Sequence, residues 1–256
     1  MRKIICIANQ KGGVGKTTTA INLSASLATA EKKTLLIDCD PQGNATSGIG
    51  IDKSTIQGKN LYHVLAGGIP LTDAIVPTQI PTLDVIPSTQ DLIGVEVEFV
   101  SLKDREHQLK KALKGLNSSY EYLIIDCPPS LGFLTINSLV ASDYLIIPLQ
   151  CEYFAMEGLG QLLNTLKLTK INFNPSINLG GVLLTMFDTR NRLSHRVADE
   201  VRKYFGSRVY KTVIPRNVRL SECPSHGLPI VLYDINCRGA LSYMALAQEI
   251  LSDRRN

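Results

Sequence analysis

The chain has 256 residues, of which 44% are hydrophobic and 20% are charged, and its formal net charge is +4 at pH 7. This length fits one large α/β domain over residues 1–256, with two small domains possible but not required, and the composition is ordinary for a soluble globular protein. No run of about 18 apolar residues occurs, and Ile4–Ala8 is too short for the core of a signal peptide. We therefore expect a cytoplasmic protein without a membrane span.

The chain begins with the pattern of a strand, a glycine-rich loop, a helix and a second strand. Lys3–Ala8 is a short apolar run, Thr17–Ala30 has the composition of a helix, and Thr34–Asp38 is again strand-like. Similar short apolar runs recur at Tyr122–Asp126, Tyr144–Pro148 and Leu179–Thr185. This alternation predicts a doubly wound α/β fold, in which a mainly parallel sheet carries helices on both faces.

Further helices are expected between and after these strands. Their predicted ranges are Leu102–Leu116, Leu131–Ala141, Gly158–Lys170, Arg192–Phe205 and Arg238–Leu251. Residues 51–95 hold several prolines and glycines, so only short helices and strands are expected there. The six cysteines are far apart, without a CxxC pair or zinc-finger spacing, and are interpreted as reduced, small hydrophobic residues.

The loop after the first strand has the composition of a phosphate-binding loop. It reads Asn9-Gln10-Lys11-Gly12-Gly13-Val14-Gly15-Lys16-Thr17-Thr18, and it matches G-x-x-x-x-G-K-[ST] except that Gln10 replaces the first glycine. Its backbone N–H groups and the following helix can surround phosphates, Lys16 can reach the β- and γ-phosphates, and the Thr17 hydroxyl can ligate Mg²⁺. The alternative is a turn that only joins strand to helix. Because strand, loop and helix come in the required order, the sequence predicts binding of ATP and Mg²⁺.

Three aspartates lie at the ends of predicted strands. Asp38 and Asp40 follow one apolar run, and Asp126 ends another. Strand ends of a parallel sheet meet at its ligand-binding edge, where a carboxylate can help to hold magnesium or orient an attacking water. A lone aspartate after a strand is more often a turn or cap residue, and that alternative stays open for Asp38.

Positive charge is concentrated in the C-terminal part of the chain. Residues 1–185 hold 15 Lys/Arg and 16 Asp/Glu, whereas residues 186–256 hold 12 Lys/Arg and 7 Asp/Glu. The basic residues between 190 and 219 are Arg190, Arg192, Arg196, Arg202, Lys203, Arg208, Lys211, Arg216 and Arg219. Composition alone favours a solvated face over a polyanion site, because phosphate contacts require clustering in space.

Five stretches together resemble one known family. They are the loop at residues 9–18 with Lys11 ahead of its glycines, and the segments Leu36–Thr46, Ile124–Ser130, Gln150–Gly158 and Pro215–Glu222. In this order they resemble the ParA-family (Soj-like) chromosome and plasmid partition ATPases, which belong to the ParA/MinD class of P-loop NTPases with a deviant Walker A loop. The resemblance covers essentially the whole chain.

This resemblance implies an ATPase that is slow alone and forms a homodimer when ATP is bound. Lys11 would reach the partner's phosphates across the dimer interface, although an ordinary solvated lysine is the alternative. Asp40 would position the hydrolytic water, Asp126 would hold magnesium through water, and Asp38 would support that region. Near the adenine, Pro215 would pack on the base and Asn217 would hydrogen-bond its edge, whereas the residue pattern alone makes Asn217 a helix cap.

The family also implies binding to DNA without sequence preference and association with the nucleoid. Arg190 and Arg219 match the positions at which DNA contact is most strongly expected, and Arg196, Arg202, Lys203 and Lys211 are supporting candidates. A DNA-bound partner of the ParB type would stimulate hydrolysis and release the protein from DNA.

Other members of the same class are alternatives. A ParA-like ATPase that positions another cargo would have the same loop and strand ends. A MinD-like ATPase that cycles on a membrane is disfavoured, because past Arg238 the only basic residues are Arg254 and Arg255. An iron–sulfur ATPase would need cysteines placed to bridge a cluster across a dimer, and no such motif is recognised.

Overall fold

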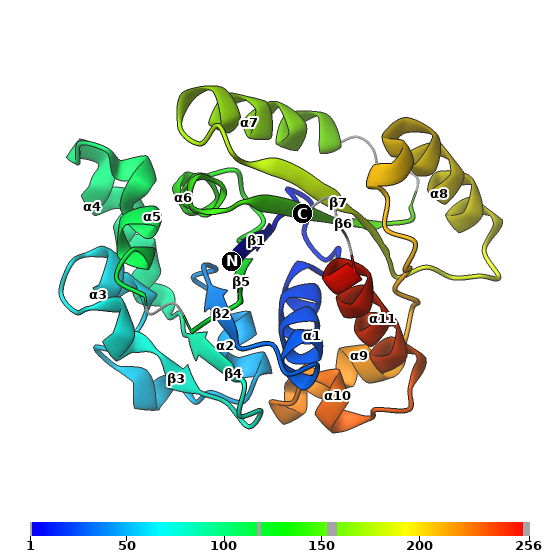
Figure 1. Cartoon of the computed structure of the whole chain (residues 1–256), viewed down its shortest axis with the longest axis horizontal. Coiled ribbons are helices and arrows are strands. Elements are labelled where there is room, and N and C mark those ends of the chain that lie inside the picture. The colour runs from blue at the N-terminus through cyan, green and yellow to red at the C-terminus, as the bar shows by residue number, and fades with distance from the viewer. Residues whose placement is uncertain (1, 117–118, 153–157, 253–256) are drawn as a thin grey trace.

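At the centre of the molecule, the part of the chain that the structure describes forms a seven-stranded sheet with the order β3-β4-β2-β5-β1-β6-β7 (Figure 1). The computed structural model describes residues 2–116, 119–152 and 158–252. The strands are β1 (Lys3–Ile7), β2 (Thr34–Asp38), β3 (Val76–Pro77), β4 (Leu83–Ile86), β5 (Tyr122–Asp126), β6 (Tyr144–Gln150) and β7 (Asn178–Thr185). Neighbouring strands run parallel except β3 and β4, which pair antiparallel.

Helices cover both faces of this sheet, as the sequence predicts. They are α1 (Lys16–Thr29), α2 (Asn44–Gly48), α3 (Leu61–Leu65), α4 (Gly94–Glu98), α5 (Gln108–Leu113), α6 (Phe133–Ala141), α7 (Leu159–Asn172), α8 (Arg192–Phe205), α9 (Val218–Glu222), α10 (Ile230–Tyr233) and α11 (Arg238–Ser252). Short 3-10 turns lie between them. Among the described residues, no helix is long and apolar enough to span a bilayer.

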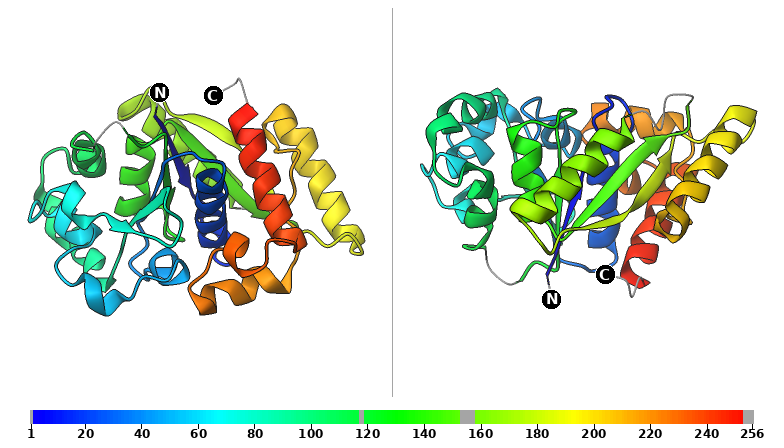
Figure 2. Two further views of the ribbon diagram at one scale, coloured as in Figure 1. Left: turned by 60° about the horizontal axis from the view of Figure 1, so that its bottom comes forward. Right: turned by 90° about the horizontal axis from the view of Figure 1, so that it is seen from above.

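Each face of the sheet has its own hydrophobic core because successive strand residues point to opposite sides. Cys6 of β1 belongs to the core under α3, α5, α6, α7 and α8, whereas its neighbours Ile5 and Ile7 belong to the core under α1 and α11. Figure 2 shows α1 and α11 side by side on the same face. All of these strand residues are buried, which explains why the strands are continuous apolar runs.

The predicted helix at Leu102–Leu116 is wrong in length. The structure has a 3-10 turn at Arg105–His107 followed by α5, which has only six residues. Asp104 has a left-handed backbone with φ of +58°, which an α-helix does not accommodate, and aspartate tolerates this conformation better than most residues. The helix predicted at Arg192–Phe205 is confirmed as α8, and residues 51–95 form short elements as expected.

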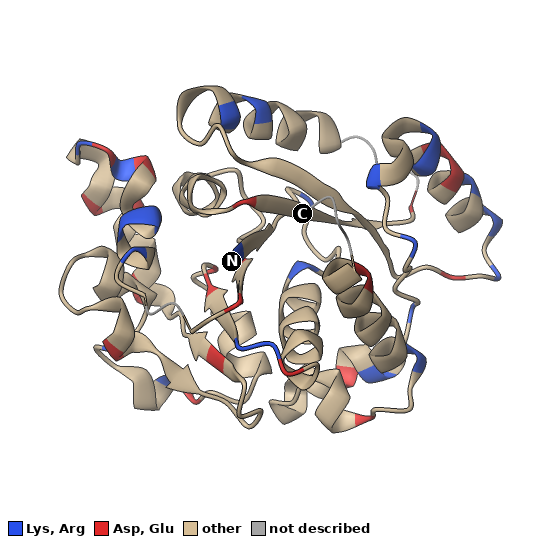
Figure 3. Cartoon of the chain, in the orientation of Figure 1, with Lys and Arg blue, Asp and Glu red and all other residues tan. Residues whose placement is uncertain are grey.

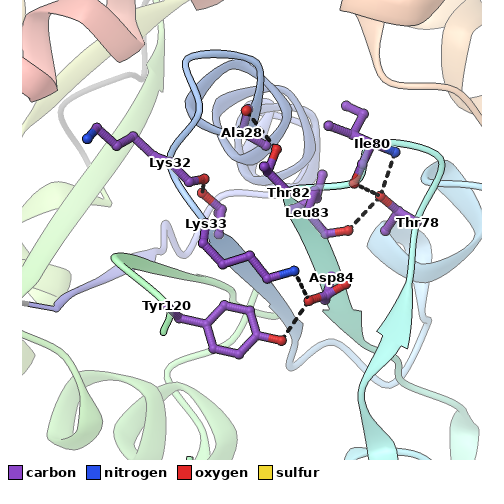
Figure 4. A network of polar contacts seen from close by, with 10 residues as sticks. Ala28, Lys32, Lys33, Thr78, Ile80, Thr82, Leu83, Asp84 and Tyr120 are labelled. Atoms are coloured by element: carbon purple, nitrogen blue, oxygen red, sulfur yellow. Dashed lines mark hydrogen bonds and ion pairs between the residues drawn. The ribbon is translucent and has the colours of Figure 1, made fainter. Parts of the chain in front are cut away.

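Polar contacts tie together the amino-terminal ends of β2, β4 and β5 (Figure 4). The Asp84 carboxylate pairs with the Lys33 ammonium and accepts a hydrogen bond of 2.6 Å from the Tyr120 hydroxyl. Thr82 Oγ1 donates to the Ala28 carbonyl at 2.7 Å, which links this edge to the end of α1. Burial raises the pKa of Tyr120, so its hydroxyl keeps its proton and remains a donor. These contacts stabilise the edge opposite to the aspartates that end β2 and β5.

Candidate functional site

The loop between β1 and α1 leaves the start of a helix open. Gly13 and Gly15 have φ of +71° and +87°, where side chains are strained, and Gly15 directly precedes the first residue of α1. No side chain caps this end of α1, and its first turn contains no acidic residue. The free N–H groups and the positive end of the helix dipole therefore favour an anion.

Two lysines of the loop have different surroundings. Lys16 is buried, and its ammonium donates to the Lys11 carbonyl at 3.1 Å. Burial lowers the pKa of Lys16, while the nearby Asp126, Cys127 and Asp40 oppose this shift. The side chain of Lys11 is 39% exposed, and its ammonium pairs with Glu152 at 3.3 Å.

Asp38 and Asp126 end neighbouring strands, and both are fully buried. Asp38 accepts hydrogen bonds on both oxygens, from the Asp40 N–H at 3.1 Å and from the N–H and hydroxyl of Thr46 at 2.8 and 2.7 Å. Burial raises the pKa of Asp38 to about 6 despite these bonds. The residue is thus fully engaged within its own loop.

Asp126 has no such partners. Neither of its buried carboxylate oxygens has a hydrogen-bond partner among the described residues, although the Thr17 hydroxyl lies near enough to lower its pKa. Burial and the neighbouring Asp38 raise the pKa of Asp126 further. A buried carboxylate without donors is costly, and a bound cation would relieve that cost. The described residues hold no cluster of three His, Cys, Asp or Glu side chains that could bind a metal by itself.

Asp40 lies with the loop around a cleft of about 290 Å³, here called the loop cleft. Its carboxylate accepts a hydrogen bond of 2.9 Å from the Gln42 N–H, and the residue is 6% exposed. The loop cleft is lined by Gly12, Gly13, Gly15, Lys16, Thr17, Thr18, Asp40, Asn44, Pro129 and Met186. The structure therefore brings Asp40 to the predicted phosphate loop.

A second cavity of about 380 Å³, here called the side pocket, adjoins the loop cleft. It shares Gly15, Thr18 and Met186 with that cleft, and Pro215 and Asn217 line it. Asn217 Oδ1 also accepts a bond of 3.4 Å from the Leu220 N–H, which confirms the cap of α9 predicted from the residue pattern. Further lining comes from apolar residues such as Ile214 and Val218.

Several residues around the site have no role predicted from the sequence. Met186 borders both cavities with φ of +49°, and no local pattern marks it. Tyr243 lines the side pocket from α11, far along the chain, and its hydroxyl contacts Thr19 Oγ1 at 3.1 Å. Glu152 lies in one of the stretches that resemble the family, but the resemblance by itself implies no role for it. Residues 153–157 of that stretch lie outside the described residues.

The predicted DNA-binding residues are Arg190, Arg196, Arg202, Lys203, Lys211 and Arg219, which lie before, on and after α8 and on α9 and are here together called the basic surface. All six are exposed, and Figure 3 shows basic residues along α8 and in the segments on either side of it. Three of them pair with carboxylates: Arg190 with Asp188 at 3.2 Å, Arg202 with Asp199 at 3.8 Å, and Arg219 with Glu222 at 3.1 Å. The side chain of Arg190 remains 88% exposed, so its pairing leaves it accessible.

Comparisons with known proteins agree with this geometry. A family model described as an AAA domain matches residues 2–179. The chain is 55% identical over 249 residues to the chromosome partitioning protein ParA of Myxococcus xanthus, with 97% of this chain and 88% of that protein covered. It is 55% identical over 253 residues to the sporulation initiation inhibitor protein Soj of Bacillus subtilis, with 99% and 100% covered.

Among solved structures, the chain is similar to a cobyrinic acid a,c-diamide synthase from Mycobacterium smegmatis with bound ADP and magnesium. The TM-score is 0.86 at 35% identity, and the match covers 98% of this chain and 94% of that one. The fold is thus shared with a nucleotide-binding protein. Because the ParA and Soj relatives match nearly the whole chain at more than half of the aligned residues, the chain belongs to the ParA/Soj family of chromosome-partitioning ATPases.

Proposed function

We propose that the chain is an ATPase that binds ATP across the loop cleft and the side pocket, and that ATP controls its binding to DNA. One observation carries this proposal: the uncapped start of α1, the buried Lys16 and Asp40 meet at a cavity that continues into an apolar pocket, and the buried Asp126 lies close to Thr17 and Lys16 of that cavity. Phosphates fit the first part and a planar base fits the second. Pro215 would pack on the base, and Asn217 would bond its edge.

The loop residues then have separate tasks. The backbone of Gly12, Gly13, Val14, Gly15 and Thr18 would surround the phosphates, and Lys16 would bind the β- and γ-phosphates. Asp40 lines the same cleft and would orient the attacking water. Lys11 would supply positive charge to the nucleotide of a second copy, so that hydrolysis requires an ATP-bound homodimer.

Magnesium fits the carboxylate side of the loop cleft. Thr17 offers a hydroxyl oxygen, and Asp126, which lies close to that hydroxyl, offers two buried carboxylate oxygens with which it would hold the ion through water. The ion would neutralise negative charge that develops on the phosphates. Asp38 uses both oxygens within its own loop, so its role in this proposal is to hold Asp40 and Thr46 in place.

The basic surface would bind the backbone of double-stranded DNA without reading its sequence. Six exposed basic side chains lie between residues 190 and 219, and basic side chains of this kind bind phosphates without reading bases. Binding by the ATP-bound dimer would place the protein on the nucleoid. A DNA-bound partner of the ParB type would then stimulate hydrolysis and release the dimer.

A related ATPase that moves another cargo remains the second candidate, since the nucleotide site would be the same. Membrane cycling has less support. The face of α11 with Tyr243, Leu246, Ala247 and Ile250 is buried against the core, so it is not available to lie on lipid. Arg254 and Arg255, the basic residues past Arg238, lie outside the described residues.

The variant Asp40→Ala tests the enzymatic part of this proposal. We expect phosphate release in the presence of DNA to fall by about 10²-fold or more, while binding of ATP and of DNA is retained. Asp73→Ala, which removes an exposed aspartate outside the cleft, is the control and should keep full turnover. Unchanged turnover in Asp40→Ala would refute the role of Asp40.

A further inference from the structure

Lys11 is held within its own chain at three points. Its ammonium pairs with Glu152 Oε2 at 3.3 Å. Its N–H donates to Asn9 Oδ1 at 3.0 Å, and Asn9 in turn donates to the Pro148 carbonyl in β6 at 2.7 Å. Its carbonyl accepts the bond of 3.1 Å from Lys16. This lysine is therefore tied to β6 and to the phosphate-binding lysine.

Glu152 is itself well placed to hold Lys11. It follows the carboxyl end of β6, and Gln150 Nε2 donates to its Oε1 at 2.5 Å. The other oxygen faces Lys11, which is the one cation paired with Glu152 among the described residues. The glutamine thus orients the carboxylate, and the charge of the carboxylate acts on Lys11.

We propose that Glu152 is a positioning residue that restrains Lys11 inside its own protomer and so opposes ATP-dependent dimerisation. This inference rests on the proposed function, in which Lys11 must turn toward the nucleotide of a second copy. The pair with Glu152 must then break once in each protomer. A half-exposed ion pair is weak enough to break reversibly.

Bound nucleotide would also weaken the hydrogen bond that Lys16 donates to the Lys11 carbonyl. Phosphates in the loop cleft attract the Lys16 ammonium, which then no longer bonds the Lys11 carbonyl. Binding of nucleotide in one protomer would therefore help to release the Lys11 of that protomer, which then reaches the nucleotide of the partner. Without nucleotide, the ion pair of Lys11 with Glu152 and the hydrogen bond from Lys16 to the Lys11 carbonyl both favour the monomer.

The isosteric variant Glu152→Gln tests this restraint because it keeps an acceptor for Gln150 and removes the charge that holds Lys11. Dimerisation is measured by sedimentation equilibrium with Mg²⁺ and a non-hydrolysable ATP analogue. Exposed pairs typically contribute between about 1.4-fold and 5-fold to an equilibrium. With two pairs per dimer, we expect the dimer dissociation constant to fall by between about 2-fold and about 30-fold.

A matched control comes from the pair Lys32–Glu121 at the other edge of the sheet. Its distance is 3.2 Å and its side chains are 37% and 48% exposed, against 3.3 Å, 39% and 47% for Lys11–Glu152. Glu121→Gln should leave dimerisation unchanged. The difference between Glu152→Gln and wild type should also shrink as salt screens the pair, an effect that a purely structural role would not produce.

The outcomes separate this inference from the function on which it rests. Wild-type protein that stays monomeric with the analogue would overturn the dimer and the restraint together. Wild-type protein that dimerises while Glu152→Gln dimerises no more tightly would overturn the restraint alone. Weaker dimerisation of Glu152→Gln would also overturn it, because the carboxylate would then act within the dimer. Tighter dimerisation that is lost in high salt, with Glu121→Gln unchanged, supports the restraint.

Discussion

Asp38 and Asp126 lie side by side because the parallel register of β2 and β5 pairs them at the carboxyl ends of these strands. Asp38 accepts hydrogen bonds from the N–H and hydroxyl of Thr46 and from the N–H of Asp40. Asp126 has no hydrogen-bond partner among the described residues. Burial raises the pKa of both carboxyl groups, that of Asp38 to about 6. Negative charge at these two carboxyl groups is therefore unfavourable in the free protein, at the place where a cation is proposed to bind.

Asp126→Asn should stabilise the protein in EDTA and without nucleotide. Burial and the neighbouring Asp38 raise the pKa of Asp126, so above about pH 4 the native state binds a proton at Asp126 that the unfolded state has lost, and wild-type stability falls as pH rises above that value. Removing the Asp126 charge should add about 1–3 kcal/mol at pH 7.5 and less at pH 5. Urea unfolding at both pH values measures this. A variant that is less stable than wild type at pH 7.5 would contradict this prediction. In a separate measurement, ATP with Mg²⁺ should raise the stability of the variant less than that of wild type.

The two roles of Asn217 can be separated by substitution. Aspartate is as good a helix cap as asparagine but lacks the amide N–H donor, so Asn217→Asp should keep the stability of α9 and weaken ATP binding about tenfold. Asn217→Ala should also lose about 1 kcal/mol of stability. Calorimetric titration with ATP and thermal unfolding measure the two effects. Equal ATP affinity in wild type and Asn217→Asp would remove Asn217 from base recognition.

Arg190→Glu and Arg219→Gln should weaken ATP-dependent DNA binding. Glutamine is chosen at position 219 because a third carboxylate beside Glu222 and Asp234 would disturb α9. The slope of the logarithm of the binding constant against the logarithm of the salt concentration reports the number of phosphate contacts. Removing one side chain that binds a phosphate should lower its magnitude by about 1, or by about 2 in a dimer. Fluorescence anisotropy with random-sequence duplexes measures this, with Lys170→Gln on α7 as a control. If both variants bind like wild type, the basic surface is only a solvated face.

Tyr120→Phe should lower stability without affecting ATP turnover. The Tyr120 hydroxyl donates to the buried Asp84 at 2.6 Å, at the edge of the sheet opposite to the loop cleft. Its loss should cost about 1–2 kcal/mol in urea unfolding. Tyr204→Phe, at a tyrosine that is 68% exposed, is the control and should change stability little. A Tyr120→Phe protein as stable as wild type would show that the Asp84 contacts contribute little.

The strands of the sheet can be predicted because their residues are buried on both faces. The predicted strands Thr34–Asp38 and Tyr122–Asp126 begin and end at the same residues as β2 and β5. A strand that is buried on both faces is a continuous apolar run, so its limits can be recognised in the sequence. The helix predicted at Leu102–Leu116 is wrong in length, and the left-handed backbone at Asp104 explains why the α-helix of this segment, α5, starts only after that residue. The order of residues in this segment does not indicate that Asp104 has a left-handed backbone.

The parts of the site that are made by consecutive residues can be predicted from the sequence. The parts that join distant segments of the chain cannot. The loop at residues 9–18 contains its own signal in its glycines and lysines. The contacts of Lys11 with Glu152 and of Thr19 with Tyr243 join residues 141 and 224 positions apart, so only the folded sheet brings them together. That neither oxygen of Asp126 has a hydrogen-bond partner among the described residues is likewise a property of packing.

The most direct test of the account is binding of the protein to random-sequence double-stranded DNA with ATP, with ADP and without nucleotide, each over a series of salt concentrations. We predict binding with ATP and Mg²⁺ only, and an affinity that falls steeply as salt rises, because the contacts are to phosphates. Equal binding in all three nucleotide states, or none with ATP at low salt, would contradict the claim that ATP controls a DNA-bound form.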